Sequence, residues 1–172
     1  METGKFVFVI GGARSGKSAF ALKLAGALPS PRRYLATALA LDQEMRERVE
    51  AHKKERGGGW ETIEEPRDVG GALHAIGDGV VLVDCLTLWL TNLVEAGLTD
   101  AEIEEEARRL CAAACGSKAA VIAVSNEVGL GIVPANGLAR RFRDLSGMVN
   151  RLCAEAAAEV YFLAAGIPMR MK

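Results

Sequence analysis

The sequence predicts an α/β protein with a mainly parallel sheet and helices on both faces. Short, continuous apolar runs alternate with longer segments of helical periodicity along the whole chain. An uninterrupted apolar run is typical of a strand buried on both faces, as in a parallel sheet. The first such run leads directly into a glycine-rich segment of the kind that binds phosphate. A chain of 172 residues is expected to form one domain over residues 1–172.

Six short segments are predicted strands because they are rich in apolar or β-branched residues and too short for helices. In chain order they are Phe6–Ile10, Tyr34–Ala38, Val80–Asp84, Ala119–Val124, Val160–Leu163 and, as an edge strand, Ile167–Met171. Residues 60–78 show no clear pattern and remain unassigned.

Five segments are predicted helices because apolar residues recur at spacings of three and four. They are residues 16–27, 42–56, 86–95, 99–114 and 137–157. In the first, Phe20, Leu24 and Ala27 share one face. The second is highly charged and ends at three consecutive glycines, which no helix tolerates well. Thr99 with Glu102 is a plausible N-terminal cap for the fourth.

The glycine-rich segment matches GxxxxGK[ST] and is the strongest functional signal in the chain. It comprises Gly11, Gly12, Ala13, Arg14, Ser15, Gly16, Lys17 and Ser18, and is called the phosphate loop below. Glycines let backbone N–H groups surround a phosphate, while the lysine reaches the β and γ oxygens. The following helix directs its positive end toward the anion. A strand before the loop and a helix after it complete the context of a P-loop nucleotide-binding fold.

Asp84 ends the third predicted strand. A carboxylate at this point of a P-loop fold usually faces the phosphates and, with the Ser18 hydroxyl, holds Mg²⁺. The alternative is an aspartate that caps the next helix, and both roles can coexist.

Composition excludes several other classes of protein. Hydrophobic residues are 50% and charged residues 25%, the proportions of a globular chain. A net charge of −1 disfavours a nucleic-acid binder, and no apolar run is long enough to span a membrane. Four cysteines without a CxxC pair and two histidines give little support to a zinc site. Cys111 and Cys115 are expected to be small buried side chains, and free thiols are typical of a cytoplasmic protein.

His52 lies in the charged segment 45–56, at i+7 from Met45 and therefore on the less polar face of the predicted helix. Taken alone, such a histidine more often lies at the boundary of the core with its hydrogen bonds satisfied. The adjacent Lys53, Lys54 and Arg56 would then simply form a solvated helix face. Beside a nucleotide site, a neutral imidazole is a competent nucleophile toward phosphorus. Nearby cations would keep it neutral. His74 has no comparable setting and is expected to be structural.

Several segments together resemble one family, the bifunctional adenosylcobinamide kinases/adenosylcobinamide-phosphate guanylyltransferases of cobalamin biosynthesis. The resemblance covers essentially the whole chain. Besides the phosphate loop, it is carried by Tyr34–Thr37, Arg48–Lys53, Trp60–Glu64, Thr91–Leu93, Ser125–Pro134 and Leu138–Asp144. The Asn126–Pro134 loop and the segment after it are far more specific than the phosphate loop.

The resemblance implies a RecA-like sheet, a homotrimer, and two reactions that use ATP or GTP. Adenosylcobinamide is phosphorylated, and its phosphate then receives GMP from GTP by way of a guanylylated histidine. His52 matches that histidine. Other positions matching nucleotide contacts are Ala36, Thr37, Ala38, Lys53, Lys54, Glu55, Arg56, Glu64 and Asp84.

Two other functions remain open from the residues alone. The first is a plain P-loop kinase for a small metabolite, with a structural His52. The second is a GTP-dependent switch, disfavoured because Glu127 follows Asn126 where regulatory GTPases carry Asn-Lys-x-Asp.

Overall fold

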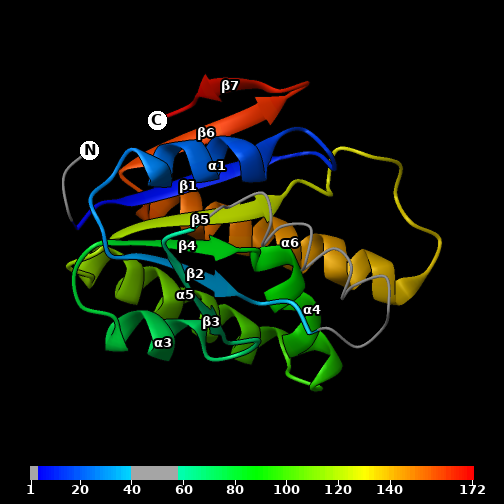
Figure 1. Ribbon diagram of the computed structural model, residues 1–172. Coiled ribbons are helices and arrows are strands. Elements are labelled where there is room, and N and C mark those ends of the chain that lie inside the picture. Colours follow the sequence, from blue (N-terminus) through cyan, green and yellow to red (C-terminus); the bar gives the residue numbers. More distant parts are fainter. Residues whose placement is uncertain (1–3, 40–57) are drawn as a thin grey trace.

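The computed structural model describes residues 4–39 and 58–172. Within these ranges, the sheet has seven strands in the order β3-β2-β4-β5-β1-β6-β7 (Figure 1). Every neighbouring pair is parallel except the antiparallel pair β6–β7. The strands are β1 (Phe6–Gly11), β2 (Arg32–Ala36), β3 (Trp60–Glu64), β4 (Val80–Asp84), β5 (Ala120–Asn126), β6 (Glu159–Ala164) and β7 (Ile167–Arg170).

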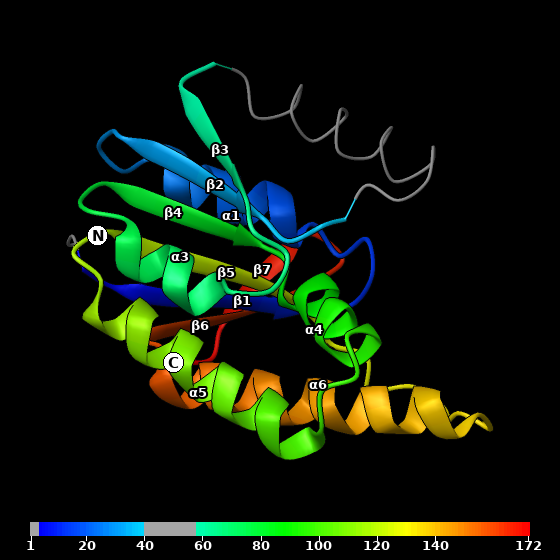
Figure 2. The same cartoon turned by 90° about the horizontal axis from the view of Figure 1, so that it is seen from below.

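The helices cover both faces of the sheet, as Figures 1 and 2 show. Helix α1 lies on one face, while α3, α5 and α6 lie on the other with α4 near the carboxyl ends of the strands. Their bounds are α1 (Lys17–Gly26), α3 (Val69–Ala75), α4 (Leu86–Glu95), α5 (Asp100–Gly116) and α6 (Gly137–Ala156). No helix in the described part of the chain meets the length and apolarity that a membrane span requires.

Strand β1 shows why this sheet needs apolar residues without alternation. Phe6, Phe8 and Ile10 pack into the core beneath α3–α6, whereas Val7 and Val9 pack into the core beneath α1. All five side chains are buried. The prediction of a mainly parallel sheet with helices on both faces is therefore confirmed, including the assignment of Ile167–Met171 as an edge strand.

The unassigned stretch 60–78 contains two elements that the sequence does not reveal. Strand β3 is an edge strand in which Glu61, Thr62 and Glu64 are exposed, so it lacks the apolar run of a central strand. Helix α3 has only seven residues and includes two glycines. Tertiary packing supports both elements where local pattern does not. The predicted helix 42–56 lies outside the described residues.

In α1 the buried side chains are Lys17, Ala21 and Ala25; Phe20 and Leu24 are partly buried against the same core, and Ala27 is exposed. One prediction about side-chain burial was wrong. On α5, Cys111 is buried with its Sγ 3.8 Å from Cys153 Sγ, but Cys115 is exposed. All four cysteines are free thiols.

The predicted cap of α5 forms as a reciprocal pair of hydrogen bonds. The Glu102 N–H donates to Thr99 Oγ1 at 3.3 Å, and the Thr99 N–H donates to Glu102 Oε2 at 2.7 Å. Two backbone donors at the helix start are thereby satisfied.

We predict that Thr99→Ala lowers the free energy of unfolding by about 1 kcal/mol, measured by urea denaturation. Thr99→Ser retains the hydroxyl and should remain close to the unmutated protein; equal losses in both variants would contradict this assignment.

Candidate nucleotide-binding site

The parallel register brings the ends of six strands, β1 to β6, to one edge of the sheet. Gly11 pairs with Asn126, and Asp84 pairs with both Val124 and Ala36. Only β5 separates β1 from β4, so two strand spacings, about 10 Å, separate the phosphate loop from Asp84. Ligands bind at this carboxyl edge in open α/β sheets.

The phosphate loop curls between β1 and α1 in a conformation that requires backbone freedom. Gly16 is the N-cap of α1 with φ 90°, in the left-handed region that favours glycine. Arg14 also has a positive φ, 55°, which costs a non-glycine residue about 1–2 kcal/mol. Such local strain is often found at functional sites.

The turn between β6 and β7 supports the loop from behind. The Gly166 N–H donates to the Ser15 carbonyl at 3.0 Å. A Cβ atom at Gly16 would lie 3.3 Å from Gly166 Cα, and one at Gly11 would overlap the carbonyl oxygen of Leu163. The sequence does not reveal this support, because the contacting residues are far apart in the chain.

Lys17 is buried at the start of α1, and its ammonium donates to the Gly12 carbonyl at 2.6 Å, across the loop. Burial lowers the pKa of this ammonium from its ordinary value, while the nearby Cys85 and Asp84 oppose that shift. Burial also raises the pKa of the Cys85 thiol to about 11, so this thiol is neutral near pH 7. With the thiol neutral, the nearby Asp84 carboxylate is the group that favours the Lys17 ammonium.

Asp84 is half-buried at the end of β4 and accepts a hydrogen bond from the Tyr34 hydroxyl, with 3.1 Å from Oη to Oδ2. The N-cap of α4 is Cys85, and no side chain caps this helix. The helix-capping alternative for Asp84 was therefore wrong. The geometry leaves this carboxylate at the edge of the sheet with the Lys17 ammonium.

Thr37 is fully buried and holds the ends of β2 and β4 together. Its hydroxyl donates to the Cys85 carbonyl at 2.7 Å and accepts from the Cys85 N–H at 2.8 Å. Its own carbonyl accepts from the Asn92 side chain at 2.8 Å. Thr37 thus positions Asp84 from within the protein. The sequence gives one indication of this network, which is the amide residue Asn92 within an otherwise apolar helix.

The remaining predicted contacts lie farther along the edge or outside the described residues. Glu64 ends β3 opposite Ala36, four strand spacings or about 19 Å from β1. Ala38 follows the end of β2 and is half-buried. His52, Lys53, Lys54, Glu55 and Arg56 lie outside the described residues.

The donors near the loop suit a cation that arrives with a nucleotide. The described residues contain no cluster of three or more His, Cys, Asp or Glu side chains that could hold a metal. Ser18 and Asp84 instead offer one hydroxyl and one carboxylate. Mg²⁺ is commonly held by one or two carboxylates together with substrate phosphates, so these residues fit it.

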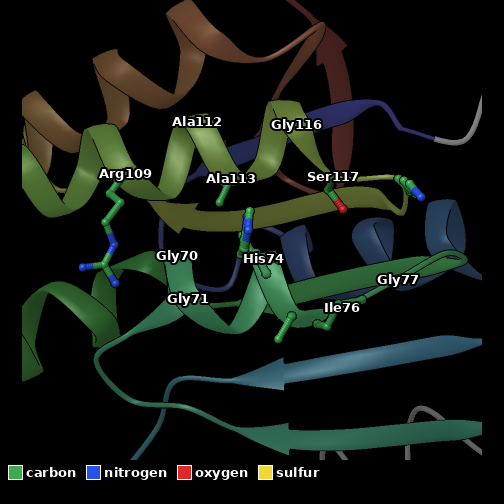
Figure 3. A pocket seen from close by; sticks show the side chains of 13 residues that line it. Gly70, Gly71, His74, Ile76, Gly77, Arg109, Ala112, Ala113, Gly116 and Ser117 are labelled. Atoms are coloured by element: carbon green, nitrogen blue, oxygen red, sulfur yellow. The ribbon is translucent and has the colours of Figure 1, made fainter.

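A second hollow lies between α3 and α5, at the opposite end of the sheet (Figure 3). His74 projects into it from the last turn of α3, among small residues of both helices. Arg109 at its rim is paired with Asp68 and, at 3.0 Å, with Glu106. No residue of the phosphate loop lines this hollow.

A phosphate loop with a buried lysine, facing an aspartate at the carboxyl edge of a parallel sheet, defines a P-loop nucleotide-binding protein. One strand, β5, lies between the strands that carry these two elements, as expected for a RecA-like sheet. The family model described as cobinamide kinase / cobinamide phosphate guanyltransferase matches residues 7–171. The chain belongs to this family, and the resemblance found in its sequence is confirmed.

Two curated relatives match almost end to end. The bifunctional adenosylcobalamin biosynthesis protein CobU of Salmonella typhimurium is 41% identical, over 96% of this chain and 99% of the relative. The bifunctional adenosylcobalamin biosynthesis protein CobP of Pseudomonas aeruginosa is 41% identical, over 95% of each chain. The solved structure of flagellar accessory protein FlaH from Methanocaldococcus jannaschii is similar in fold alone, with a TM-score of 0.55 and 12% identity over 100% of this chain and 80% of FlaH.

The Thr37 network leads to a stability prediction. Thr37→Val keeps the shape of the side chain but leaves the buried N–H of Cys85 without a partner, while the Cys85 carbonyl keeps its hydrogen bond from the Trp89 N–H. The orphaned N–H is expected to lower the free energy of unfolding by about 1–3 kcal/mol, measured by urea denaturation. Thr37→Ser keeps the hydroxyl, so its free energy of unfolding should fall much less. An unfolding midpoint unchanged in Thr37→Val would show that these hydrogen bonds are dispensable.

Proposed function

We propose that this protein phosphorylates adenosylcobinamide with ATP or GTP and then converts the phosphate to adenosylcobinamide-GDP, in cobalamin biosynthesis. The observation that carries the proposal is the buried Lys17 that bonds across the phosphate loop to the Gly12 carbonyl, in a chain of the cobinamide kinase / cobinamide phosphate guanyltransferase family. The family provides both transferase activities, and the described site has the parts that phosphoryl transfer requires.

In the kinase step, the phosphate loop binds the β- and γ-phosphates, and the Lys17 charge offsets the charge of the γ-phosphoryl group as it moves. The acceptor hydroxyl oxygen bonds to the γ-phosphorus and gives up its proton to solvent, while the bond from that phosphorus to the bridging β–γ oxygen breaks and the nucleoside diphosphate leaves. Ser18 and Asp84 would hold Mg²⁺, which supplies further charge neutralisation when bound. Tyr34 and Thr37 keep Asp84 in place.

In the guanylyl step, His52 is the nucleophile. An imidazole nitrogen bonds to the α-phosphorus of GTP, and pyrophosphate leaves with the electrons of the broken P–O bond. A phosphate oxygen of the corrinoid then attacks the same phosphorus and releases the imidazole. A covalent intermediate divides one difficult transfer between anions into two easier steps. The proposed contacts for this nucleotide are Lys53, Lys54, Glu55, Arg56, Glu64 and Ala36–Ala38.

The same proposal includes a homotrimer in the cytoplasm that does not bind nucleic acid. The family resemblance supports the trimer. The free thiols support a reducing compartment, and the net charge of −1 argues against a polyanionic partner. Sedimentation analysis of the purified protein tests the trimer directly.

A plain kinase is the second candidate, because the described phosphate loop and Asp84 account for phosphoryl transfer without His52. This candidate predicts no covalent nucleotide adduct. A GTP-dependent switch is less well supported, since Glu127 follows Asn126 where regulatory GTPases carry Asn-Lys-x-Asp. A switch would hydrolyse nucleotide slowly, and added cobinamide would not accelerate it.

The kinase step is tested with Lys17→Ala. Loss of a charge-assisted contact of about 1.5–3 kcal/mol should slow phosphorylation of adenosylcobinamide at least about tenfold. Lys23→Ala removes an exposed lysine from the same helix and should not change the rate. Phosphorylation by Lys17→Ala at the unmutated rate would show that the phosphate site is assigned incorrectly.

The guanylyl step is tested with GTP labelled at the α-phosphate. The unmutated protein should acquire the label in a bond that survives alkali and breaks in acid, as a phosphoramidate does. His52→Asn should abolish the adduct, while phosphorylation persists because the phosphate loop is intact. Mass mapping locates the labelled residue.

His74→Asn is the matched control, since His74 is the only other histidine in the sequence and lies on α3. Its labelling should equal that of the unmutated protein. An adduct that survives His52→Asn would overturn the assignment of the nucleophile. An unmutated protein without any adduct would favour the plain kinase.

A further inference from the structure

The loop between β5 and α6, residues 127–136, presents an apolar surface to solvent. With Leu138 on the first turn of α6, the exposed apolar residues form what we call the apolar rim. Leu130 is 81% exposed, Ile132 97%, and Val133 and Leu138 each 61%. Large hydrophobic side chains so exposed on a loop commonly mark an interaction site.

The loop that carries the rim begins at the phosphate loop, with a direct backbone contact. The Glu127 N–H, at the start of the β5–α6 loop, donates to the carbonyl of Gly11 at 2.9 Å. Figure 1 shows the loop, in yellow, projecting from the same edge of the sheet as the connection between β1 and α1. A molecule on the rim would therefore lie at the same edge of the sheet as the phosphate loop.

Both ends of the β5–α6 loop are held by hydrogen bonds. At the start, the Asn126 N–H donates to Thr87 Oγ1 at 2.8 Å, and the Asn150 side chain donates to the Asn126 carbonyl at 3.1 Å. At the end, Arg140 donates to the Pro134 and Ala135 carbonyls at 2.9 and 2.6 Å. The apolar side chains are thus presented on a supported frame, which lowers the entropic cost of binding.

We propose that the apolar rim binds the corrin ring of the acceptor. This inference rests on the proposed function, which requires a large acceptor beside the phosphate loop. A corrin is a broad macrocycle with methyl groups along its edge, so it needs an apolar surface wider than a typical metabolite does. Among the described residues, the other large exposed hydrophobic side chains, Ile167, Met169 and Met171, lie on or just after β7. That strand begins at the carboxyl edge with Ile167, next to Gly166, and runs away from it, so Met169 and Met171 lie farther from the phosphate loop.

A second copy of this chain is the competing occupant of the rim. Stable interfaces bury about 1,200–2,000 Å² in total, with roughly 20–30 residues from each partner. The rim comprises only a few side chains on one loop and the adjoining helical turn. Its size and its position at the same edge of the sheet as the phosphate loop both favour a small-molecule acceptor.

The test is the double variant Leu130→Ser/Ile132→Ser in the full chain. Because both side chains are exposed, the fold should be retained, which circular dichroism checks. The affinity for adenosylcobinamide, measured by equilibrium dialysis with corrin absorbance, should fall at least about tenfold, given the apolar area lost. The KM for ATP should be unchanged. Met171→Ser, 68% exposed just after β7, is the matched control and should bind adenosylcobinamide normally.

Each outcome has one meaning. An affinity for adenosylcobinamide in the double variant equal to that of the unmutated protein would overturn the inference, while the proposed function would stand. A smaller sedimentation coefficient accompanying the loss of affinity would assign the rim to contact between copies and also overturn it. An unmutated protein that does not bind adenosylcobinamide would overturn the proposed function, and the inference with it.

Discussion

The parallel register of β1, β5 and β4 is the constraint on which the rest of the structure depends. It sets the separation of the phosphate loop and Asp84, because Gly11 and Asp84 each end a strand that pairs with β5. A shift of one residue would turn every side chain of a strand to the other face. In β1 such a shift would exchange Phe8 and Val9 between two differently shaped cores. Burial on both faces therefore fixes the geometry of the site.

The same packing explains a buried lysine at the edge of the core. Small side chains on the inner face of α1, Ala21 and Ala25, allow this helix to lie against the sheet, and Lys17 begins that face. Burying an ammonium is unfavourable unless hydrogen bonds and an opposite charge compensate for the lost hydration. The Gly12 carbonyl and Asp84 provide both. A preorganised cation at this point needs little rearrangement when an anion binds.

Local pattern predicted the central strands, the long helices and the phosphate loop, because each of these elements satisfies its own periodicity or motif. It could not predict β3 or α3, whose polar and glycine-rich sequences adopt regular structure only against their neighbours. Nor could it predict the hydrogen bonds of Thr37 with Cys85 and Asn92, since these bonds join residues from separate elements. The turn at Gly166 that supports Ser15 is another such contact. Contacts with residue 52 lie outside the described residues, so the role of His52 stays a prediction.

The spacing of the strands also bears on how one small chain can support two transfers. Asp84 lies two strand spacings from the phosphate loop, whereas Glu64 lies four, or about 19 Å, away on the edge strand. Groups so far apart do not all serve one phosphorus atom. The loop with Asp84 has the groups that a γ-phosphoryl transfer requires, and Glu64 lies too far along the edge to share that transfer. The apolar rim lies on the loop that follows β5, whose first residue, Glu127, contacts Gly11, so the proposed acceptor would approach the phosphate loop from that side.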